Sequence, residues 1–247
     1  MAGWVPEGTG RGTSMPEAAI HEACRRGDVD AVRALIAADP AAVDADDEHG
    51  WRPIFHAGLW RHEPVVRLLI ESGADLAAHD GYALHYAGEV PDNKAIVALL
   101  LQYGALEAHV RPADDLSRQL LAAVFLADAA RVRSLLDRHP HLAGAADGRG
   151  DRPIHHAARN GDTEVVRLLI EHGADVNSRN TRGHTVLYCA GGHGHLGTVR
   201  LLLDAGADRD ARFTHDGKTL MEWLAQYPGD PRYVPITEAL RRHEAGT

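Results

Sequence analysis

Residues 150–177 read GDRPIHHAARNGDTEVVRLLIEHGADVN, and this segment predicts two short helices joined by a tight turn. Pro153 suits the first turn of a helix, where its missing N–H is not needed. Gly161 then interrupts the helical pattern. The run VVRLLI at 165–170 gives a second helix with a broad apolar face, and Gly173 ends it. Helices this short are marginal alone, so each hairpin must bury its apolar face against another one.

The chain repeats itself at an offset of 100 residues. The segment VVRLLIESGAD at 65–75 recurs as VVRLLIEHGAD at 165–175, and RPI at 52–54 recurs at 152–154. A shorter period of about 30 to 34 residues runs inside each block, as in helical repeat proteins. It is marked in addition by IVALLLQYGA at 96–105 and TVRLLLDAGAD at 198–208. The length fits six such units and a terminal seventh.

These motifs resemble the ankyrin-repeat family, whose pattern runs G-x-T-P-L-H-x-A-A, then G-H-x-E-V-V-x-L-L-L, then G-A-D-V-N. The segments that follow it, from the clearest to the most degenerate, are 150–177, 183–208, 50–75, 81–105, 17–44 and 117–146. The resemblance implies an all-α solenoid of stacked helix-turn-helix hairpins, with about six repeats and a C-terminal cap. It implies little about function, because one fold serves many functions.

The same pattern predicts the domain organisation. Ser14 is a capping residue followed by Pro16 and by Glu17, which marks the start of the first helix. We expect a flexible N-terminal arm at 1–13 and one ankyrin-repeat domain at 14–247. Within that domain, the expected parts are two duplicated three-repeat blocks, about 14–110 and 117–213, and a cap at 214–247. Residues 111–117 are the expected bend between the blocks.

Composition and charge exclude several classes of protein. The chain has 26 basic and 35 acidic side chains and a net charge of −9, which disfavours nucleic-acid or anionic-membrane binding. No apolar stretch is long enough to span a bilayer, and no signal peptide is visible. The chain has two cysteines, which exclude a disulfide scaffold. Cys24 is expected to be buried, whereas Cys189 is expected to face the neighbouring hairpin or the groove. These features predict a cytoplasmic protein that does not bind membranes.

The 17 histidines raise the question of a metal or catalytic site. By the resemblance, His21, His85 and His155 occupy a structural motif position, and His195 occupies a second one. His193 and His195 are two residues apart, a spacing that does not place both rings on one face of a helix. No known metal-binding, phosphate-binding or nucleophile motif is present. We therefore expect no metal, no cofactor and no catalytic residue.

A row of arginines, one per repeat, lies on the predicted second helices. Several have an acidic residue three or four positions away, which suits a solvated outer face better than a phosphate track. The row consists of Arg33, Arg67, Arg133, Arg167 and Arg200.

The resemblance also implies where a partner would bind. Ankyrin proteins usually bind through a concave groove lined by the turn tips and the end of each first helix. Aromatic residues are only 5% of this chain, yet they gather at such positions, which predicts a contact surface. The predicted groove residues are Trp51, His56, Leu59, Trp60, Tyr86, Phe125, His156, Arg159, His193 and Trp223. The alternative is that Trp60 and Phe125 pack under 111–117 or under the N-terminal arm with Trp4.

Three functions remain open from the sequence. The favoured one is a non-catalytic protein–protein interaction module that binds a partner segment in the groove, as a monomer or with weak self-association. The second is an enzyme or small-molecule binder that uses His56, Tyr86 or His156 in the same groove. An open groove excludes water poorly, which argues against it. The third is a scaffold that self-associates through the apolar patch.

Overall fold

The computed structural model describes residues 15–90, 93–106, 114–213 and 217–245. It divides the chain into two compact units, unit 1 at Met1–His109 and unit 2 at Val110–Thr247. Within the described ranges all regular structure is helical, apart from an isolated bridge between Arg179 and Thr185. The predicted arm at 1–13, Trp4 and the first part of the predicted bend lie outside the described residues.

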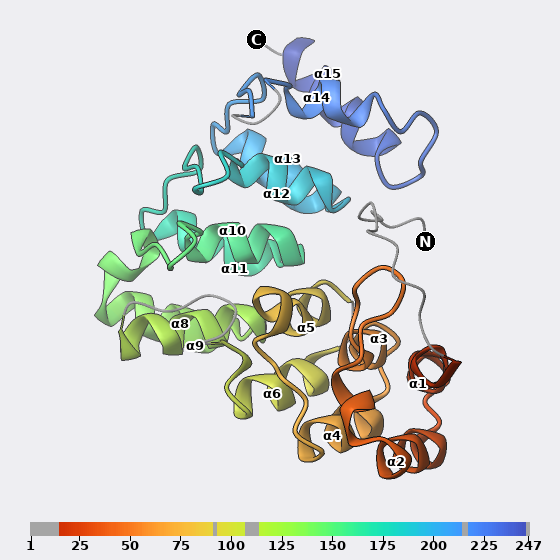
Figure 1. Cartoon of the computed structure of the whole chain (residues 1–247). Helices are drawn as coiled ribbons and strands as arrows, with labels where there is room; N and C mark the ends of the chain where they lie inside the picture. The colour runs from red at the N-terminus through yellow and green to blue at the C-terminus, as the bar shows by residue number, and fades with distance from the viewer. Residues whose placement is uncertain (1–14, 91–92, 107–113, 214–216, 246–247) are drawn as a thin grey trace. The chain divides into compact units, whose positions relative to one another are not determined.

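Unit 1 consists of three helical hairpins (Figure 1). The first helices of the hairpins are α1 (Met15–Arg26), α3 (Pro53–Leu59) and α5 (Ala78–Glu89). The second helices are α2 (Val29–Ala38), α4 (Glu63–Glu71) and α6 (Lys94–Gln102), and a short 3-10 helix, η1 (Pro40–Asp44), follows α2.

Unit 2 has three hairpins of the same kind and a closing pair of helices. Its first helices are α8 (Asp115–Phe125), α10 (Pro153–Asn160) and α12 (Val186–Gly192), and its second helices are α9 (Ala129–Arg138), α11 (Thr163–Glu171) and α13 (Leu196–Asp204). The 3-10 helix η2 (Pro140–Gly144) follows α9, and α14 (Leu220–Leu224) and α15 (Val234–Ala245) close the chain.

Within each unit the hairpins stack in chain order. The first helix of each hairpin packs on the first helix of the next hairpin. In unit 1, α1 packs on α3 and α3 on α5; in unit 2, α8 packs on α10, α10 on α12 and α12 on α14. Second helices follow the same order, α2, α4, α6 and α9, α11, α13, α15. This is the nearest-neighbour packing of an all-α solenoid of stacked hairpins, as the sequence predicts.

The helix ends follow the residues that the sequence singled out. Pro153 occupies the first turn of α10, and Gly161 caps that helix with a φ of 77°. Gly173, with a φ of 86°, directly follows the C-cap of α11. A side chain at Gly161 would also collide with the ring of His195 from the next hairpin. Both the positive φ and this close contact therefore require glycine at position 161.

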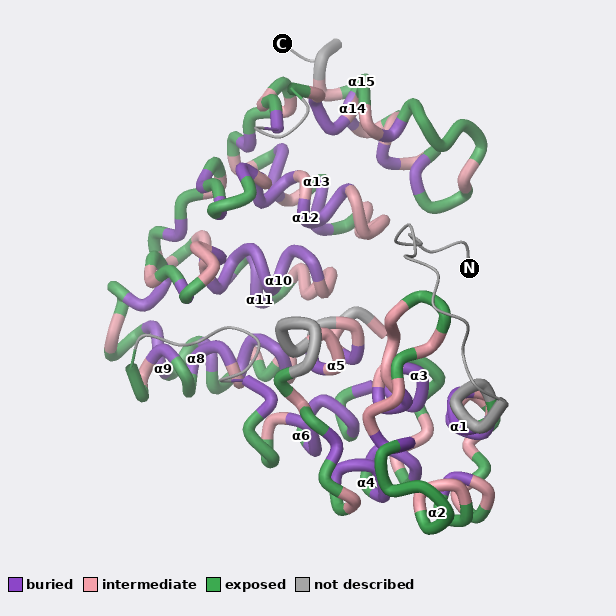
Figure 2. Tube along the Cα trace, in the orientation of Figure 1, coloured by how far each residue is buried: buried purple, intermediate pink, exposed green. Residues whose placement is uncertain are grey.

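The core runs between the helices of neighbouring hairpins, and Figure 2 shows buried positions on the facing sides of the helices. In α11, Val165, Val166, Leu168 and Leu169 are fully buried, whereas Arg167 is exposed. The other arginines of the row, Arg33, Arg67, Arg133 and Arg200, are exposed as well, and Arg67 pairs with Glu63 at 2.8 Å. The outer face is therefore solvated, as predicted.

Both cysteines are buried in the first helices of their hairpins, as the sequence predicts for Cys24. Burial raises the pKa of the Cys24 thiol to about 12, so this sulfur stays a neutral thiol at physiological pH.

The shared core makes a central position more costly to change than a terminal one. Leu169→Ala should lower the free energy of unfolding by about 2–5 kcal/mol, because both flanking hairpins lose contacts. Leu240→Ala in α15 should instead loosen only the C-terminal end, although Leu240 is equally buried. Urea denaturation with hydrogen exchange measures both effects, and Arg167→Ala on the exposed face of α11 is the control. A larger loss for Leu240→Ala would contradict a stack of nearest neighbours.

Candidate functional site

Histidine side chains tie successive hairpins together. His21 Nε2 bonds to the carbonyl of Ala45 at 2.9 Å, and His155 Nε2 bonds to that of Ser178 at 3.2 Å. At the start of the second helices, His62 and His195 bond back to the carbonyls of Arg25 and Arg159, at 3.0 and 2.8 Å. The structural role predicted for His21, His155 and His195 is therefore observed. The side chain of His85 lies outside the described residues.

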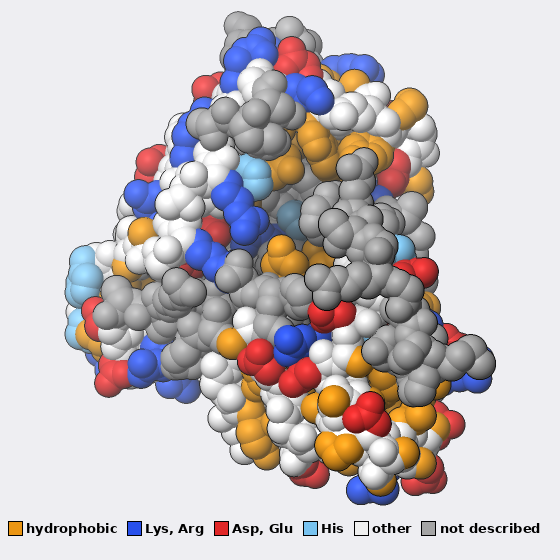
Figure 3. All heavy atoms as spheres, in the orientation of Figure 1, with side chains coloured by type: hydrophobic (Ala, Val, Ile, Leu, Met, Phe, Trp, Pro, Cys, Tyr) orange, Lys and Arg blue, Asp and Glu red, His pale blue; other side chains and the backbone are white. Residues whose placement is uncertain are grey.

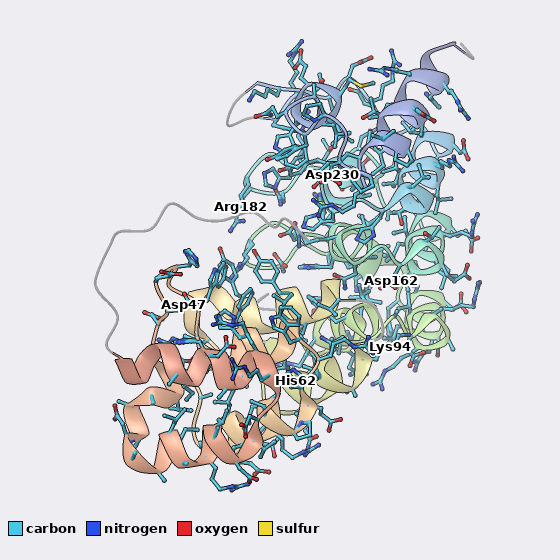
Figure 4. All side chains as sticks on the ribbon, turned by 90° about the vertical axis from the view of Figure 1, so that its right-hand side faces the viewer. Asp47, His62, Lys94, Asp162, Arg182 and Asp230 are labelled. Carbon is cyan, nitrogen blue, oxygen red and sulfur yellow. The ribbon has the colours of Figure 1, made fainter. Side chains whose placement is uncertain are left out.

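Each unit contains the same Asp–His pair at an offset of 100 residues. In unit 1, Asp47 Oδ2 contacts His56 Nε2 at 2.8 Å, and in unit 2, Asp147 Oδ2 contacts His156 Nε2 at 2.9 Å. The other oxygen of each carboxylate accepts two backbone N–H bonds from its own loop, which for Asp47 come from His49 and Trp51. The pair thus fixes the loop before α3 or α10 to the helix that follows it. Figure 4 labels Asp47, the carboxylate of the pair in unit 1.

In unit 2 the pair belongs to a larger buried network. Asp151 Oδ1 accepts from Arg159 Nη2 at 3.3 Å and from Asn180 Nδ2 at 2.9 Å. The Arg159 guanidinium also lies 3.8 Å from Cys189 Sγ. Asn180 and Cys189 come from the following repeat, so the network joins two hairpins through side chains that are 10% exposed or less.

The pKa values of this network reflect burial and its charges. Burial alone would raise the pKa of Asp151, but the neighbouring Arg159 guanidinium and the amide of Asn180 hold it well below its usual range. Burial lowers the pKa of His155 to about 4, so this ring is neutral at physiological pH. In unit 1, burial likewise lowers the pKa of His56, although the hydrogen bond with Asp47 acts in the opposite direction.

Only one set of side chains in the described part of the chain has metal-ligand spacing. Atoms of Asp147, Asp151 and His156 lie within 4.8 Å of one another. Both carboxylates already have partners, however. Asp147 contacts two backbone N–H groups and His156. Asp151 accepts hydrogen bonds from Arg159 and Asn180. The arrangement is that of an internal ion network that holds a loop in place.

Four of the predicted groove residues are in the interior, and the sequence prediction that they line an open surface is wrong. They are His56, Phe125, His156 and Arg159, each with 8% or less of the residue exposed. They are buried because each contacts an adjacent loop or hairpin. His56 and His156 bond to Asp47 and Asp147, and Arg159 donates a hydrogen bond to Asp151. The ring of Phe125 lies 5.2 Å from that of His156.

Unit 1 exposes two large apolar side chains at the end of α3. Trp60 is 45% and Leu59 is 38% exposed. Trp51 and Tyr86 are half-buried and meet two aromatic residues that the sequence analysis missed, Phe55 and Tyr82. The ring of Trp51 stacks on Phe55 at 4.2 Å, and Tyr86 meets both rings edge-on. We call Trp51, Phe55, Leu59, Trp60, Tyr82 and Tyr86 the aromatic patch. Four of its rings contact one another, and Leu59 and Trp60 follow at the C-terminal end of α3. Spacings of four residues, 51-55-59 and 82-86, were the signal that could have identified Phe55 and Tyr82.

The two remaining predicted residues lie in unit 2. His193 is half-buried, and its Nδ1 contacts the carbonyl of Cys189 at 2.8 Å. Trp223 is half-buried among tyrosines, with its ring 4.9 Å from that of Tyr227 and 5.7 Å from that of Tyr233. Tyr227 is 44% exposed, so this end of unit 2 also presents an aromatic side chain to solvent.

Comparison with known proteins gives one family. The family model described as ankyrin repeats (3 copies) matches residues 7–80 and 120–213. The chain is 30% identical to the NF-kappa-B inhibitor cactus of Drosophila yakuba over 64% of its length. It is 32% identical to mouse Rabankyrin-5 over 53% of its length, and 30% identical to the mouse B-cell lymphoma 3 protein homolog over 56%. It spans 32% of the cactus protein, 11% of Rabankyrin-5 and 32% of the third relative.

The neutral, buried His155 makes unit 2 sensitive to acid. The ring has a pKa of about 4 in the folded chain against 6.5 when unperturbed. Its stabilising contribution is therefore complete above pH 6.5 and declines as the pH falls towards 4, because the unfolded chain takes up the proton first. Between pH 7.5 and 5 this loss should be about 2 kcal/mol.

Urea denaturation at the two pH values measures the loss. His155→Gln should fold with lower stability at pH 7.5 and show a smaller decline towards pH 5 than the parent chain. His141→Gln, at an exposed histidine, is the control and should keep the parental decline. An equal decline in His155→Gln and the parent would show that this ring is not the titrating group.

Proposed function

Since the chain belongs to the ankyrin-repeat family, we propose that it is a non-catalytic module that binds a segment of a partner protein through the aromatic patch of unit 1. The exposure of Trp60 and Leu59 is the observation that carries this proposal. Large apolar side chains that stay in water gain free energy when a partner covers them, and tryptophan and tyrosine are common anchors of protein interfaces.

The comparison of the two units supports a binding role for this position. Residues 151 and 159 of unit 2 are Asp and Arg, and they form a buried ion pair. The residues 100 positions earlier are Trp51 and Leu59, so unit 1 has apolar side chains where unit 2 has charged ones. Both units keep the Asp–His pair that shapes the loop. The difference therefore changes the surface and leaves the framework in place.

The relatives support the same general role. Membership in a family that includes an inhibitor of NF-kappa-B is consistent with action through another protein. Among the described helices, none is long and apolar enough to cross a bilayer. Two buried thiols suit a reducing environment, and we propose the cytoplasm as the compartment.

The geometry does not favour the catalytic alternative. Of its three candidate residues, His56 and His156 are buried and bonded to Asp47 and Asp147. Tyr86 is part of the aromatic patch, where its ring contacts Trp51 and Phe55.

Trp60→Ala tests the patch with little expected loss of stability, since the ring is half exposed. It should weaken the binding of a peptide selected from a random 12-residue display library against the full chain by about thirtyfold. Fluorescence polarisation with the labelled synthetic peptide measures the affinity.

Tyr103→Ala is the matched control, because Tyr103 is also 45% exposed but follows the second helix α6. It should bind the peptide as the parent chain does. Equal effects of the two changes, or unchanged binding by a folded Trp60→Ala, would place the contact surface elsewhere. Loss of a concentration-dependent dimer in Trp60→Ala, measured by sedimentation, would favour self-association instead.

A further inference from the structure

The net charge of the chain is confined to unit 1. Residues 1–109 contain 17 acidic and eight basic side chains, whereas residues 110–247 contain 18 of each. Unit 1 therefore carries the whole net charge of −9, although the two units are built from duplicated sequence. A field of this size attracts cations over a distance of about 10 Å at 0.1 M salt.

Part of this charge lies beside the aromatic patch. The loop that leads into Trp51 carries Asp44, Asp46, Asp47 and Glu48, and the side chains of Asp46 and Glu48 are 54% and 77% exposed. Figure 3 shows acidic side chains next to hydrophobic ones over the elements of unit 1. Within the described structure, the guanidinium of Arg52 pairs with Asp44, Asp46 and Asp75, at 3.1, 3.6 and 3.3 Å. The Arg52 guanidinium is thus shared among three carboxylates.

A shallow pocket joins the rings to one of these carboxylates. Its lining includes Trp51, Phe55, Tyr82, Asp75 and Arg52, which pairs with Asp75, and the space there is about 270 Å³, open solvent included. The Trp51 and Tyr82 rings lie 5.4 Å apart at an angle of 43°. The faces of tryptophan and tyrosine attract cations, and a neighbouring carboxylate adds to that attraction.

We propose that the partner segment is basic, and that one of its arginine or lysine side chains enters this pocket, with its stem on the rings and its charge towards Asp75 and the loop at 44–48. This inference rests on the proposed function and names the chemistry of the partner. Arginine suits the pocket better, because its planar guanidinium stacks on aromatic rings and binds carboxylates through two hydrogen bonds.

The composition of the peptides selected against the full chain is the first test. Selected sequences should be enriched in arginine and lysine over the starting library. The best synthetic peptide should lose at least tenfold in affinity when its basic residues are changed to glutamine. Enrichment of neutral or acidic peptides that still depend on Trp60 would overturn the basic partner and leave the proposed function standing. Failure to select peptides that depend on Trp60 would overturn both.

The second test separates the loop charges from the total charge. The double change Asp46→Asn with Glu48→Gln should weaken the binding of the peptide by about five- to tenfold at 50 mM salt. The difference in affinity from the parent chain should shrink at 0.5 M salt. Asp30→Asn with Glu71→Gln removes two exposed charges from α2 and α4 and should have less than a twofold effect. Glu48→Gln alone, at the most exposed carboxylate of the loop, should keep the parental melting temperature and bind the peptide about threefold more weakly. Equal losses in the two double variants would show that only the net charge matters, and would overturn the pocket.

Discussion

No described helix of this protein is long enough to be stable by itself. The helices contain five to 12 residues, and isolated helices of this length are marginal in water. Each one becomes stable only by burying its apolar face on the hairpins before and after it, as Leu169 does in α11. The positions of the loops, the inward turn of the histidines and the surfaces that remain exposed all depend on this stacking.

The fold could be predicted from the sequence because it depends on local signals that repeat. Pro153, Gly161 and the run at 165–170 place a helix start, a turn and an apolar face, and the same signals recur in the other repeats. The candidate site could be predicted only in part. Trp60 and Leu59 are exposed as expected, but Arg159 is buried, because Asp151 and Asn180 enclose it. Asn180 comes from the next repeat, so the burial of Arg159 depends on a contact that no single repeat contains.

The two units show how one framework accommodates two different surfaces. Asp47 with His56 and Asp147 with His156 hold equivalent loops in the same way. A position next to each loop then differs, Trp51 in one unit and Asp151 in the other, and the ring meets Phe55 whereas the carboxylate meets Arg159. Because the loop is held by its own Asp–His pair, the neighbouring position can change from a charged group to an aromatic one. The duplicated blocks therefore differ in charge and in exposed apolar surface, although the helices of their first two hairpins begin at residues 100 positions apart.

The histidine bonds between hairpins also bear on how the chain responds to mechanical force. His62 and His195 each connect the start of a second helix to a carbonyl of the preceding repeat, and these bonds lie between successive hairpins. Under tension applied to the two ends, such bonds and the packing around them would give way one repeat at a time. Each rupture would release about 30 residues, or roughly 100 Å of extended chain. The molecule would then lengthen in steps and shorten again as each hairpin restacks.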